Sequence, residues 1–468
     1  MTEPGRPRKL SSIERNSLIA RVRQEGGRET SHLLPAQTHR IREADSFENL
    51  PGYGEIRVQM SVAREIGIET PFYRIHDAKA GAATVVSGSV KSNFTSYDYL
   101  GLNGHPEIAE SVANAARTWG TSVSASRLTS GERPFHSAFE ATLARHYNAQ
   151  AALLFVSGHA TNLALVGSVV GSGDLLLHDA LAHNSIVIGG EMSGAHRRSF
   201  AHNDLDQLDQ MLATQRQRYR HCLIATEGLF SMDGDGPDLA RLIEIKRRHG
   251  AWLMIDEAHS LGVLGPTGAG LFEHFGIDPA EVDIWMGTLS KTLVSCGGYV
   301  AAPAPLIDVL KYRAPGMVYS VGISAPAAYA AMTAFDIMLR EPGRVARLQA
   351  NGKHLLERAR DRELPSGSSW GSAVAPIMTG DSLQTVLLAE QLLARGFAVV
   401  PVIPPGVPEK LARLRLFLSA DHSTCDIDKV IDVMADERDA VIQAGVSVSS
   451  FAGTTLAARF EATSGELP

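Results

Sequence analysis

The chain of 468 residues contains little cysteine and no long apolar run. Its three cysteines, Cys222, Cys296 and Cys425, lie far apart and form no CxxC pair, which excludes a disulfide scaffold and a metal finger. No run of about 18 uninterrupted apolar residues occurs, so no transmembrane helix is expected. The start, MTEPGRPRKLSS, lacks the apolar core of a secretory signal peptide. These absences predict a cytoplasmic protein with reduced thiols and no metal site.

The chain also has no excess of positive charge. Its 44 Lys and Arg stand against 51 Asp and Glu, and the net charge of −7 offers no electrostatic footprint for nucleic acid. A hydrophobic fraction of 44% and a charged fraction of 20% are ordinary for a globular protein and exclude a collagen-like or fully disordered chain. At about 100–200 residues per domain, the length predicts about two to four domains, or one large domain with appendages.

Residues 1–92 differ in composition from the rest of the chain. Residues 1–50 are rich in Arg, Glu and Ser, with one helical stretch near Ile13–Arg23. Ser61–Ile66 is a candidate short helix, and Pro71–Val90 predicts short strands around a Gly-Ala turn. We interpret the segment as an N-terminal extension and packing arm. An element that docks a partner protein is the alternative interpretation.

Residues 93–335 alternate short apolar runs with amphipathic stretches. The runs at Ala151–Val156, Cys222–Thr226 and Trp252–Ile255 predict strands, and Leu239–His249 predicts a helix. This alternation is typical of an α/β domain with a mostly parallel sheet, covered on both faces and joined by right-handed crossovers.

Residues 336–468 predict a second, smaller α/β unit with a polar tail. Its helices are expected near 344–360 and 382–395, and its strands near 375–378, 398–402 and 413–418.

The densest polar cluster, IDEAHS at 255–260, directly follows an apolar strand. Ligands of open α/β sheets sit beyond the carboxyl ends of strands, so Asp256 is placed to face one. A carboxylate there needs a cation or a hydrogen-bond donor. His259, three residues on, can reach the same ligand. A capping Asp with a His on a turn is the structural alternative.

A second cluster, GTLSKT at 287–292, follows the largely apolar Val282–Met286. A lysine among small hydroxyl residues suits either a phosphate or a covalent imine. If Lys291 is buried, its pKa falls and the free amine becomes nucleophilic. A surface lysine after a strand is the structural alternative.

A third cluster, VSGHATN at 156–162, has the pattern of a strand, a glycine turn and a helix start. Exposed amides at a helix N-terminus bind phosphate without a basic side chain. The cluster matches neither a Walker loop nor the dinucleotide GxGxxG motif.

Together, the clusters follow the order phosphate turn, Asp-x-x-His, Ser-Lys, and Asp256 lies 35 residues before Lys291. This ordered set suits pyridoxal 5′-phosphate (PLP), which needs a lysine for a covalent bond, an acid at the pyridine nitrogen and a phosphate cradle. The protonated ring is an electron sink that stabilises a carbanion next to nitrogen.

Eight stretches resemble a known family: NFTSYDYLGLNGHP, SGERPFH, LLFVSGHATN, FAHNDLDQL, TEGLFSMDGD, LMIDEAHSLGVLGPTGAG, GTLSKTL and ARLRLFLS. Through them the chain resembles the α-oxoamine synthases, which include 8-amino-7-oxononanoate synthase, 5-aminolevulinate synthase, glycine C-acetyltransferase and serine palmitoyltransferase. The resemblance runs from about Asn93 to about Val433. It implies a fold-type I PLP-dependent transferase of the aspartate aminotransferase type, with a PLP-binding large domain at 93–335 and a small domain at 336–468.

The resemblance also implies the catalytic residues. Lys291 would hold the cofactor covalently, and Asp256 would pair with its pyridinium nitrogen. His259 would hydrogen-bond its phenolic oxygen, and His136 would stack on its ring.

Further residues are implied around the cofactor and the substrate. Gly158 and His159 would give backbone amides to the phosphate, and Thr288 and Ser290 would add hydroxyls. The lining residues would be Glu227, Ser231 and His183. Arg415 would clamp the carboxylate of the amino acid, which suits a planar bidentate donor, and Tyr97 would contact the substrate. In a homodimer, Ser320 would reach the phosphate of the neighbouring subunit.

Three positions depart from the common family pattern. Tyr97 stands where many members have Asn, and His159 stands where an aromatic residue is usual. The familiar YSTS segment reads YSVG here, which leaves Ser320 as the nearest hydroxyl. With the long extension, these departures argue against primary biotin or haem synthesis. The stretches GTSVSASRLTSGERP, HDALAHNSI and YSVG look more like oxoamine synthases of polyketide or other acyl-carrier-protein pathways, and hence of secondary metabolism.

The implied reaction is a decarboxylative condensation of a small amino acid with an acyl thioester, carried by CoA or acyl carrier protein. It gives an α-amino ketone, CO2 and a free thiol. Another fold-type I chemistry, such as transamination or aldol cleavage, is one alternative. A non-catalytic regulatory subunit of the same fold is the other, although Lys291, Asp256 and His259 are all present.

Overall fold

The computed structural model describes residues 46–50, 52–54, 56–57, 60, 70–404, 406–443 and 447. The chain forms two compact units, Met1–Gln59 and Met60–Pro468. In the first unit, the 3-10 turn η1 (Phe47–Asn49) begins where the Ser46 hydroxyl accepts the N–H of Glu48. The helices predicted near 13–23 and 61–66 lie outside the described residues.

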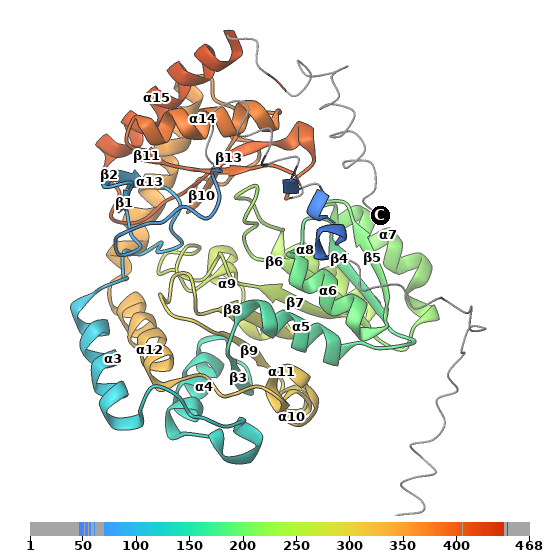
Figure 1. Ribbon diagram of the computed structural model, residues 1–468. Helices are drawn as coiled ribbons and strands as arrows, with labels where there is room; N and C mark the ends of the chain where they lie inside the picture. The colour runs from blue at the N-terminus through green and yellow to red at the C-terminus, as the bar shows by residue number, and fades with distance from the viewer. Residues whose placement is uncertain are drawn as a thin grey trace, which may run out of the picture. The chain divides into compact units, whose positions relative to one another are not determined.

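A mostly parallel sheet of seven strands dominates the second unit, in the order β3-β9-β8-β7-β6-β4-β5 (Figure 1). Strands β4 to β8 run parallel to one another, and β9 runs antiparallel to its neighbours β3 and β8. The predicted α/β architecture is therefore confirmed. The strands are β3 (Ala151–Phe155), β4 (Leu175–Asp179), β5 (His196–Phe200), β6 (Cys222–Glu227), β7 (Trp252–Asp256), β8 (Ile284–Thr288) and β9 (Gly298–Ala302).

The central strands are apolar without alternation because both faces of the sheet are covered. In β7, Leu253 and Ile255 pack into one buried core, and Met254 packs into a second core on the other face. The helices around the sheet are α5 (Gly158–Val169), α6 (Asn184–Ser193), α7 (Leu205–Gln215), α8 (Leu239–His249), α9 (Leu271–Phe275), α10 (Ala304–Arg313) and α11 (Pro315–Val318).

Helix α8 illustrates how local sequence sets these elements. The carboxylate of Asp238 accepts the N–H of Arg241 and caps the start. Gly250 ends the helix at a φ of 58°, a left-handed conformation that glycine adopts without strain. The bounds match the predicted helix.

Before the main sheet, the chain forms a β-hairpin, a π-turn and two helices. They are β1 (Ala83–Val86), β2 (Ser89–Asn93), α3 (Pro106–Trp119), η2 (Arg127–Gly131) and α4 (Pro134–His146). The hairpin reverses at Ser87-Gly88, where φ is 50° and 73°, and not at the predicted Gly-Ala pair. A two-residue hairpin turn of this kind needs positive φ at both positions, which Gly88 supplies readily.

The C-terminal part carries two small sheets of three strands, β1-β2-β11 and β10-β13-β12. Their strands here are β10 (Val374–Met378), β11 (Phe397–Ala398), β12 (Val400–Val402) and β13 (Arg413–Phe417). The single strand predicted at 398–402 is thus wrong in detail. It divides at Val399, because β11 pairs with β2 of the N-terminal arm and β12 pairs with β13.

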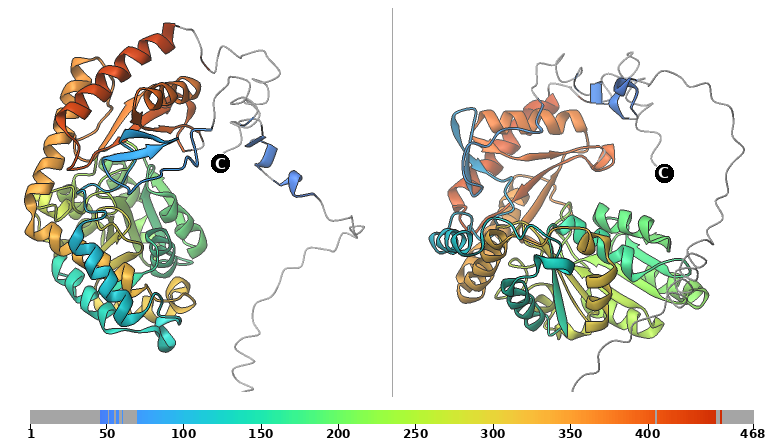
Figure 2. Two further views of the ribbon diagram at one scale, coloured as in Figure 1. Left: turned by 60° about the vertical axis from the view of Figure 1, so that its left-hand side comes forward. Right: turned by 60° about the horizontal axis from the view of Figure 1, so that its bottom comes forward.

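Four long helices complete this part: α12 (Ala325–Arg340), α13 (Pro342–Asp361), α14 (Ser382–Ala394) and α15 (Thr424–Gln443). Helices α13 and α15 lie side by side (Figure 2), and Arg358 of α13 forms ion pairs with Asp428 and Asp432 of α15. No described helix is both long enough and apolar enough to cross a bilayer. The domain boundaries at 92/93 and 335/336 stay a prediction.

Candidate functional site

The predicted site residues gather at the carboxyl-terminal edge of the main sheet. Glu227 ends β6, Asp256 ends β7 and Thr288 ends β8, and Glu227 lies directly opposite Asp256 in the parallel ladder. The same edge holds the turn from β3 into α5, which begins at Gly158. Strand ends that meet at one edge are where open α/β sheets bind ligands.

Asp256 is 3% exposed, and both of its carboxylate oxygens accept hydrogen bonds. One oxygen accepts the N–H of Ala258 at 2.9 Å, and the other accepts Nδ2 of Asn162 at 2.8 Å. These two donors hold the carboxylate in place. Asn162 is a site residue that the sequence prediction missed, although it ends the quoted stretch SGHATN.

Burial lowers the pKa of Lys291 to about 8. The negative charges of Asp256 and Glu227 oppose this shift, and the cation of Arg415 adds to it. The ammonium lies 5.7 Å from the centre of the Tyr97 ring. A lysine in this setting releases its proton nearer to neutral pH than a surface lysine does, as the predicted nucleophile requires.

Glu227 is fully enclosed beside these groups. Burial first, and then the negative charge of Asp256, raise its pKa well above the ordinary value. The carboxyl also accepts the backbone N–H of His183. Glu227 therefore holds its proton more firmly than an ordinary glutamic acid does.

His259 is buried and neutral. Burial, followed by the charges of Lys291 and Arg415, lowers its pKa well below 6.5. Its Nδ1 lies 2.7 Å from the hydroxyl of Tyr99, and its ring stacks on Phe417 with 13° between the planes. Tyr99 is the second residue that the prediction missed, because nothing in the SYDYLGL stretch distinguishes it from Tyr97.

The turn into α5 is built from close backbone contacts. A Cβ at Gly158 would lie 2.6 Å from Oγ1 of Thr288, so only glycine fits there. Ser157 caps the helix and accepts the N–H groups of Ala160 and Thr161. Because the first N–H groups of a helix have no partner within it, the amides of Gly158 and His159 face outward.

Two hydroxyls lie beside this turn. Oγ1 of Thr288 is 2.8 Å from Oγ of Ser290. Backbone amides, two hydroxyls and a helix start form a cradle suited to phosphate.

His183 and His159 stand next to each other, with ring centres 6.1 Å apart. Burial lowers the pKa of His183. The carboxylate of Asp256 raises this pKa, and the charge of Lys291 lowers it further. The charges of both Asp256 and Lys291 therefore act on the His183 ring.

His136 occupies different surroundings. It is fully buried, its Nδ1 accepts the N–H of Arg133 at 3.1 Å, and its Nε2 lies 3.0 Å from the carbonyl of Ile323. Glu132 is its nearest carboxylate, at 3.7 Å. Stacking of His136 on a cofactor ring stays a prediction.

Arg415 on β13 is 9% exposed, and its Nε has no hydrogen-bond partner among the described residues. Its Nη1 donates to the carbonyl of Ser231 at 3.2 Å, and its guanidinium lies 4.5 Å from the centre of the Phe417 ring. Burial lowers its pKa, and Tyr97 is one of the groups that oppose this shift. An unpartnered, buried guanidinium N–H is suited to an anionic ligand.

Ser320 lies between α11 and α12, apart from the strand ends, where its hydroxyl donates only to the carbonyl of Val321. Its neighbour Tyr319 is 85% exposed. The placement agrees with a residue that acts on another subunit, and that role stays a prediction.

A polar cavity of about 380 Å³ opens beside Lys291. It extends from the lysine to the N-terminal arm. Its lining is mostly hydroxyl, amide and small side chains: His76, Ala78, Ala80, Thr84, Asn93, Thr95, Ser96, Tyr97, Asp98, Asn103, Ser290, Lys291, Val294 and Ser295.

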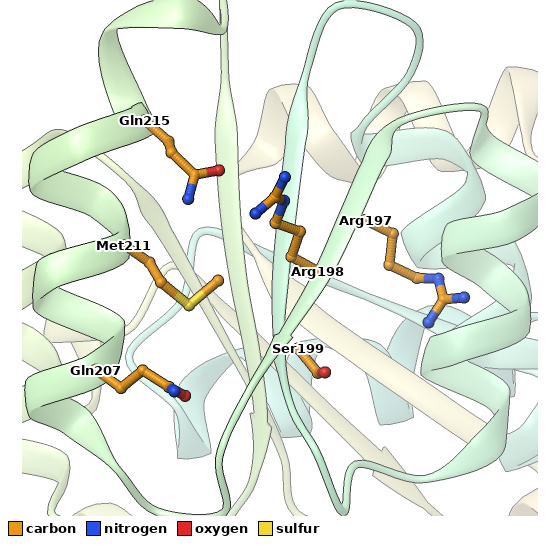
Figure 3. A pocket seen from close by; sticks show the side chains of 6 residues that line it. All are labelled: Arg197, Arg198, Ser199, Gln207, Met211 and Gln215. Atoms are coloured by element: carbon orange, nitrogen blue, oxygen red, sulfur yellow. The ribbon is translucent and has the colours of Figure 1, made fainter. Parts of the chain in front are cut away.

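A second hollow, of about 540 Å³, lies between the edge strand β5 and helix α7. Figure 3 shows Gln207, Met211 and Gln215 along one face of α7, with Arg198 of the strand directed toward them. It shares no residue with the predicted site.

Comparisons with known proteins agree with this geometry. The chain matches the model of the family "Aminotransferase class I and II" over residues 89–434. It is 38% identical over 356 residues to the 8-amino-7-oxononanoate synthase of Methylobacterium sp. (strain 4-46), a match that covers 76% of this chain and 89% of that protein.

Two solved serine palmitoyltransferases are similar in structure. That of Sphingomonas wittichii superimposes with a TM-score of 0.81 and 26% identity, covering 85% of this chain and 100% of the other. That of S. paucimobilis, solved with PLP and myriocin bound, gives a TM-score of 0.80 and 25% identity over 83% of this chain and 98% of the other.

Proposed function

Because this chain belongs to the aminotransferase class I and II family and, within it, to the α-oxoamine synthases, we propose that it is a PLP-dependent acyltransferase. It condenses a small amino acid with an acyl thioester, and the amino acid loses its carboxylate as CO2. The products are an α-amino ketone and a free thiol. The observation that carries this conclusion is the placement of Lys291, with its lowered pKa, beside Asp256 at the carboxyl edge of the sheet.

The residues present fit PLP. Only glycine fits at position 158 against Thr288, and the first amides of α5 are suited to a phosphate. Asp256, held by two donors, is an acid of the kind that keeps a pyridine nitrogen protonated. Lys291 supplies the amine for the covalent bond, and Thr288 and Ser290 supply hydroxyls to the phosphate. When bound, PLP supplies an electron sink for negative charge on the carbon next to the amino-acid nitrogen.

The chain's own residues would then orient the amino acid and move protons. Arg415 binds the carboxylate through its guanidinium, whose Nε has no protein partner among the described residues. Lys291 would remove the proton from Cα as a general base. His259 would donate or accept a hydrogen bond through Nε2, because its Nδ1 is hydrogen-bonded to the Tyr99 hydroxyl.

The acyl carrier, the assembly and the cellular location are parts of the same proposal. We infer a cytoplasmic homodimer in which Ser320 of one subunit approaches the phosphate of the other. The thioester is carried by CoA or by an acyl carrier protein. The N-terminal extension favours an acyl carrier protein as the donor, and with it a role in secondary metabolism.

One variant tests the assignment of Lys291. Lys291→Ala should abolish the visible absorbance that PLP gives when bound to the wild type, and should lower turnover at least about 10²–10⁴-fold, the usual worth of one positioned acid–base group. Lys353→Ala, on the exposed side of α13, is the matched control and should behave as wild type. Wild-type absorbance in Lys291→Ala would refute the assignment.

The reaction class is tested by its products. The holoenzyme is incubated with glycine, L-alanine or L-serine and a series of acyl-CoA donors, and CO2 and free thiol are measured together. We expect equal amounts of both. Formation of a 2-oxo acid or an aldehyde without thiol, with all donors, would instead establish transamination or aldol cleavage.

The donor is tested by deletion. Removal of residues 1–60 should reduce activity with an acyl carrier protein donor more than activity with the matching acyl-CoA. Equal loss with both donors, or no loss with either, would remove the docking role of the extension.

A further inference from the structure

A chain of hydrogen bonds runs from Asp256 to His183 through two residues that the proposed mechanism does not use. Nδ2 of Asn162 donates to Asp256 at 2.8 Å and to Oγ of Ser185 at 3.0 Å. Oγ of Ser185 lies 2.6 Å from Nδ1 of His183. Asn162 is 2% exposed and Ser185 is fully buried, so water does not replace these contacts.

The direction of each hydrogen bond follows from Asp256. An ionised carboxylate only accepts hydrogen bonds, so the amide of Asn162 must turn its NH2 group toward Asp256. The second hydrogen of that NH2 group then points at Ser185, whose oxygen accepts it. The hydroxyl hydrogen of Ser185 is left to donate to Nδ1 of His183.

An independent contact also shows that Nδ1 of His183 accepts a hydrogen bond. His183 is the N-cap of helix α6, and its Nδ1 accepts the backbone N–H of Ser185 at 3.3 Å. A backbone N–H can only donate, so Nδ1 must carry a lone pair and not a proton.

We propose that Asn162 and Ser185 are positioning residues that hold His183 as the neutral Nε2–H tautomer, with its N–H edge directed into the site. The inference rests on the proposed function for what that edge meets: an acceptor oxygen of the substrate. The tautomer itself follows from Asp256, Asn162 and Ser185 alone.

The arrangement gives His183 a defined task. Its Nδ1 edge is tied inward to Ser185, and its Nε2 has no partner among the described residues. Asp256, Lys291 and His159 act on the pKa of the ring, Glu227 accepts the backbone N–H of His183, and His183 in turn acts on the pKa of His259. A ring that donates at Nε2 binds a carboxylate or carbonyl oxygen, whereas the other tautomer would present a lone pair to it and repel it.

Nitrogen-15 NMR of full-length holoenzyme with labelled histidine tests the tautomer directly. The His183 signals are identified by their loss in His183→Gln. In the wild type we expect an unprotonated Nδ1 and a protonated Nε2 between pH 6 and 8. A protonated Nδ1 overturns the proposal without any further variant.

Variants then test the two positioning residues. Ser185→Ala removes one hydrogen bond to the neutral form, so the pKa of His183 should rise by about one unit and both tautomers should appear. Ser193→Ala, the same change on the same helix at a half-buried hydroxyl that bonds only to backbone, should leave the His183 signals unchanged. An unchanged His183 in Ser185→Ala, or the same change in both variants, overturns the role of Ser185.

Kinetics separate this inference from the proposed function. Ser185→Ala should raise the KM for the amino acid more than it lowers kcat, because the donor at Nε2 is lost from a fraction of the molecules. If the wild-type tautomer is as expected but no thiol is released with any donor, the proposed reaction fails and the hydrogen-bond chain stands. If thiol is released but Nδ1 of His183 is protonated, the proposed reaction stands and the hydrogen-bond chain fails.

Discussion

Folding stability should fall as the pH rises from neutral toward 10, because of a single histidine away from the catalytic cluster. His202 lies between two buried carboxylates, with Nδ1 2.9 Å from Asp179 and Nε2 3.2 Å from Asp235. Although burial alone would lower it, the two carboxylates raise the pKa of His202 from 6.5 to about 10. The folded protein thus holds a proton that the unfolded chain releases near pH 6.5.

The sign and size of the effect follow from this difference. A raised pKa stabilises the fold fully below pH 6.5, and the contribution is lost as the pH rises through about 10. At about 1.4 kcal/mol per unit, the upper bound is about 4–5 kcal/mol. The His202 side chain keeps 22% of its exposure, so water screens the pairs and we expect about 2–4 kcal/mol.

Equilibrium urea unfolding, followed by tryptophan fluorescence at a series of pH values, measures this effect. His202→Gln should be destabilised by about 2–4 kcal/mol at pH 6.5, and the difference from wild type should vanish near pH 10. Ser368→Ala, which removes a 2.7 Å hydrogen bond to Asp235 but no titrating group, is the control. It should cost about 1 kcal/mol at every pH. A His202→Gln difference that is constant across the range would refute the reasoning.

Two further perturbations address the site. Gly158→Ala should weaken PLP binding at least tenfold in a fluorescence titration, because its Cβ would collide with Thr288. The control is Gly171→Ala, whose Cβ would make an ordinary contact of 3.8 Å and which should bind PLP as the wild type does. Equal weakening in both variants would contradict the phosphate cradle. Tyr99→Phe should lower the free energy of unfolding by about 1–3 kcal/mol, since it leaves a buried nitrogen of His259 without its partner, and an unchanged urea midpoint would count against that hydrogen bond.

Local sequence was sufficient to predict three of the seven strands of the main sheet and helix α8. Apolar runs of four to six residues bounded by glycine or polar turns correspond to β3, β6 and β7, and the capping residues Asp238 and Gly250 mark the ends of α8. These features depend on neighbours in the chain, such as side chains that cap their own helix. The division of the predicted strand at Val399 does not, because it depends on two sheets whose other strands come from residues 83–93 and 374–417.

The candidate site divides in the same way. Asp256, Lys291 and Gly158 were predictable because each lies at or within three residues of the end of a strand, and strand ends meet at one edge of a parallel sheet. Asn162 and Tyr99 were not, because their importance lies in contacts with residues 94 and 160 positions away in the chain. The sequence assigns ring stacking to His136 and only a lining role to His183, and the structure alone shows the hydrogen bonds that join His183 to Asp256 through Ser185 and Asn162.

The sequence by itself determined the chemical inventory of the protein: an amine, an acid and a glycine turn in an order suited to PLP, on a chain whose apolar pattern builds a parallel sheet. Tertiary structure alone decided the protonation and direction of those groups. The low pKa of Lys291, the raised pKa of Glu227 and the orientation of the Asn162 amide arise from burial and from charges that meet only when distant strands pack together. Electrostatic energies depend on distance in space and on exclusion of water, neither of which is written in the order of residues.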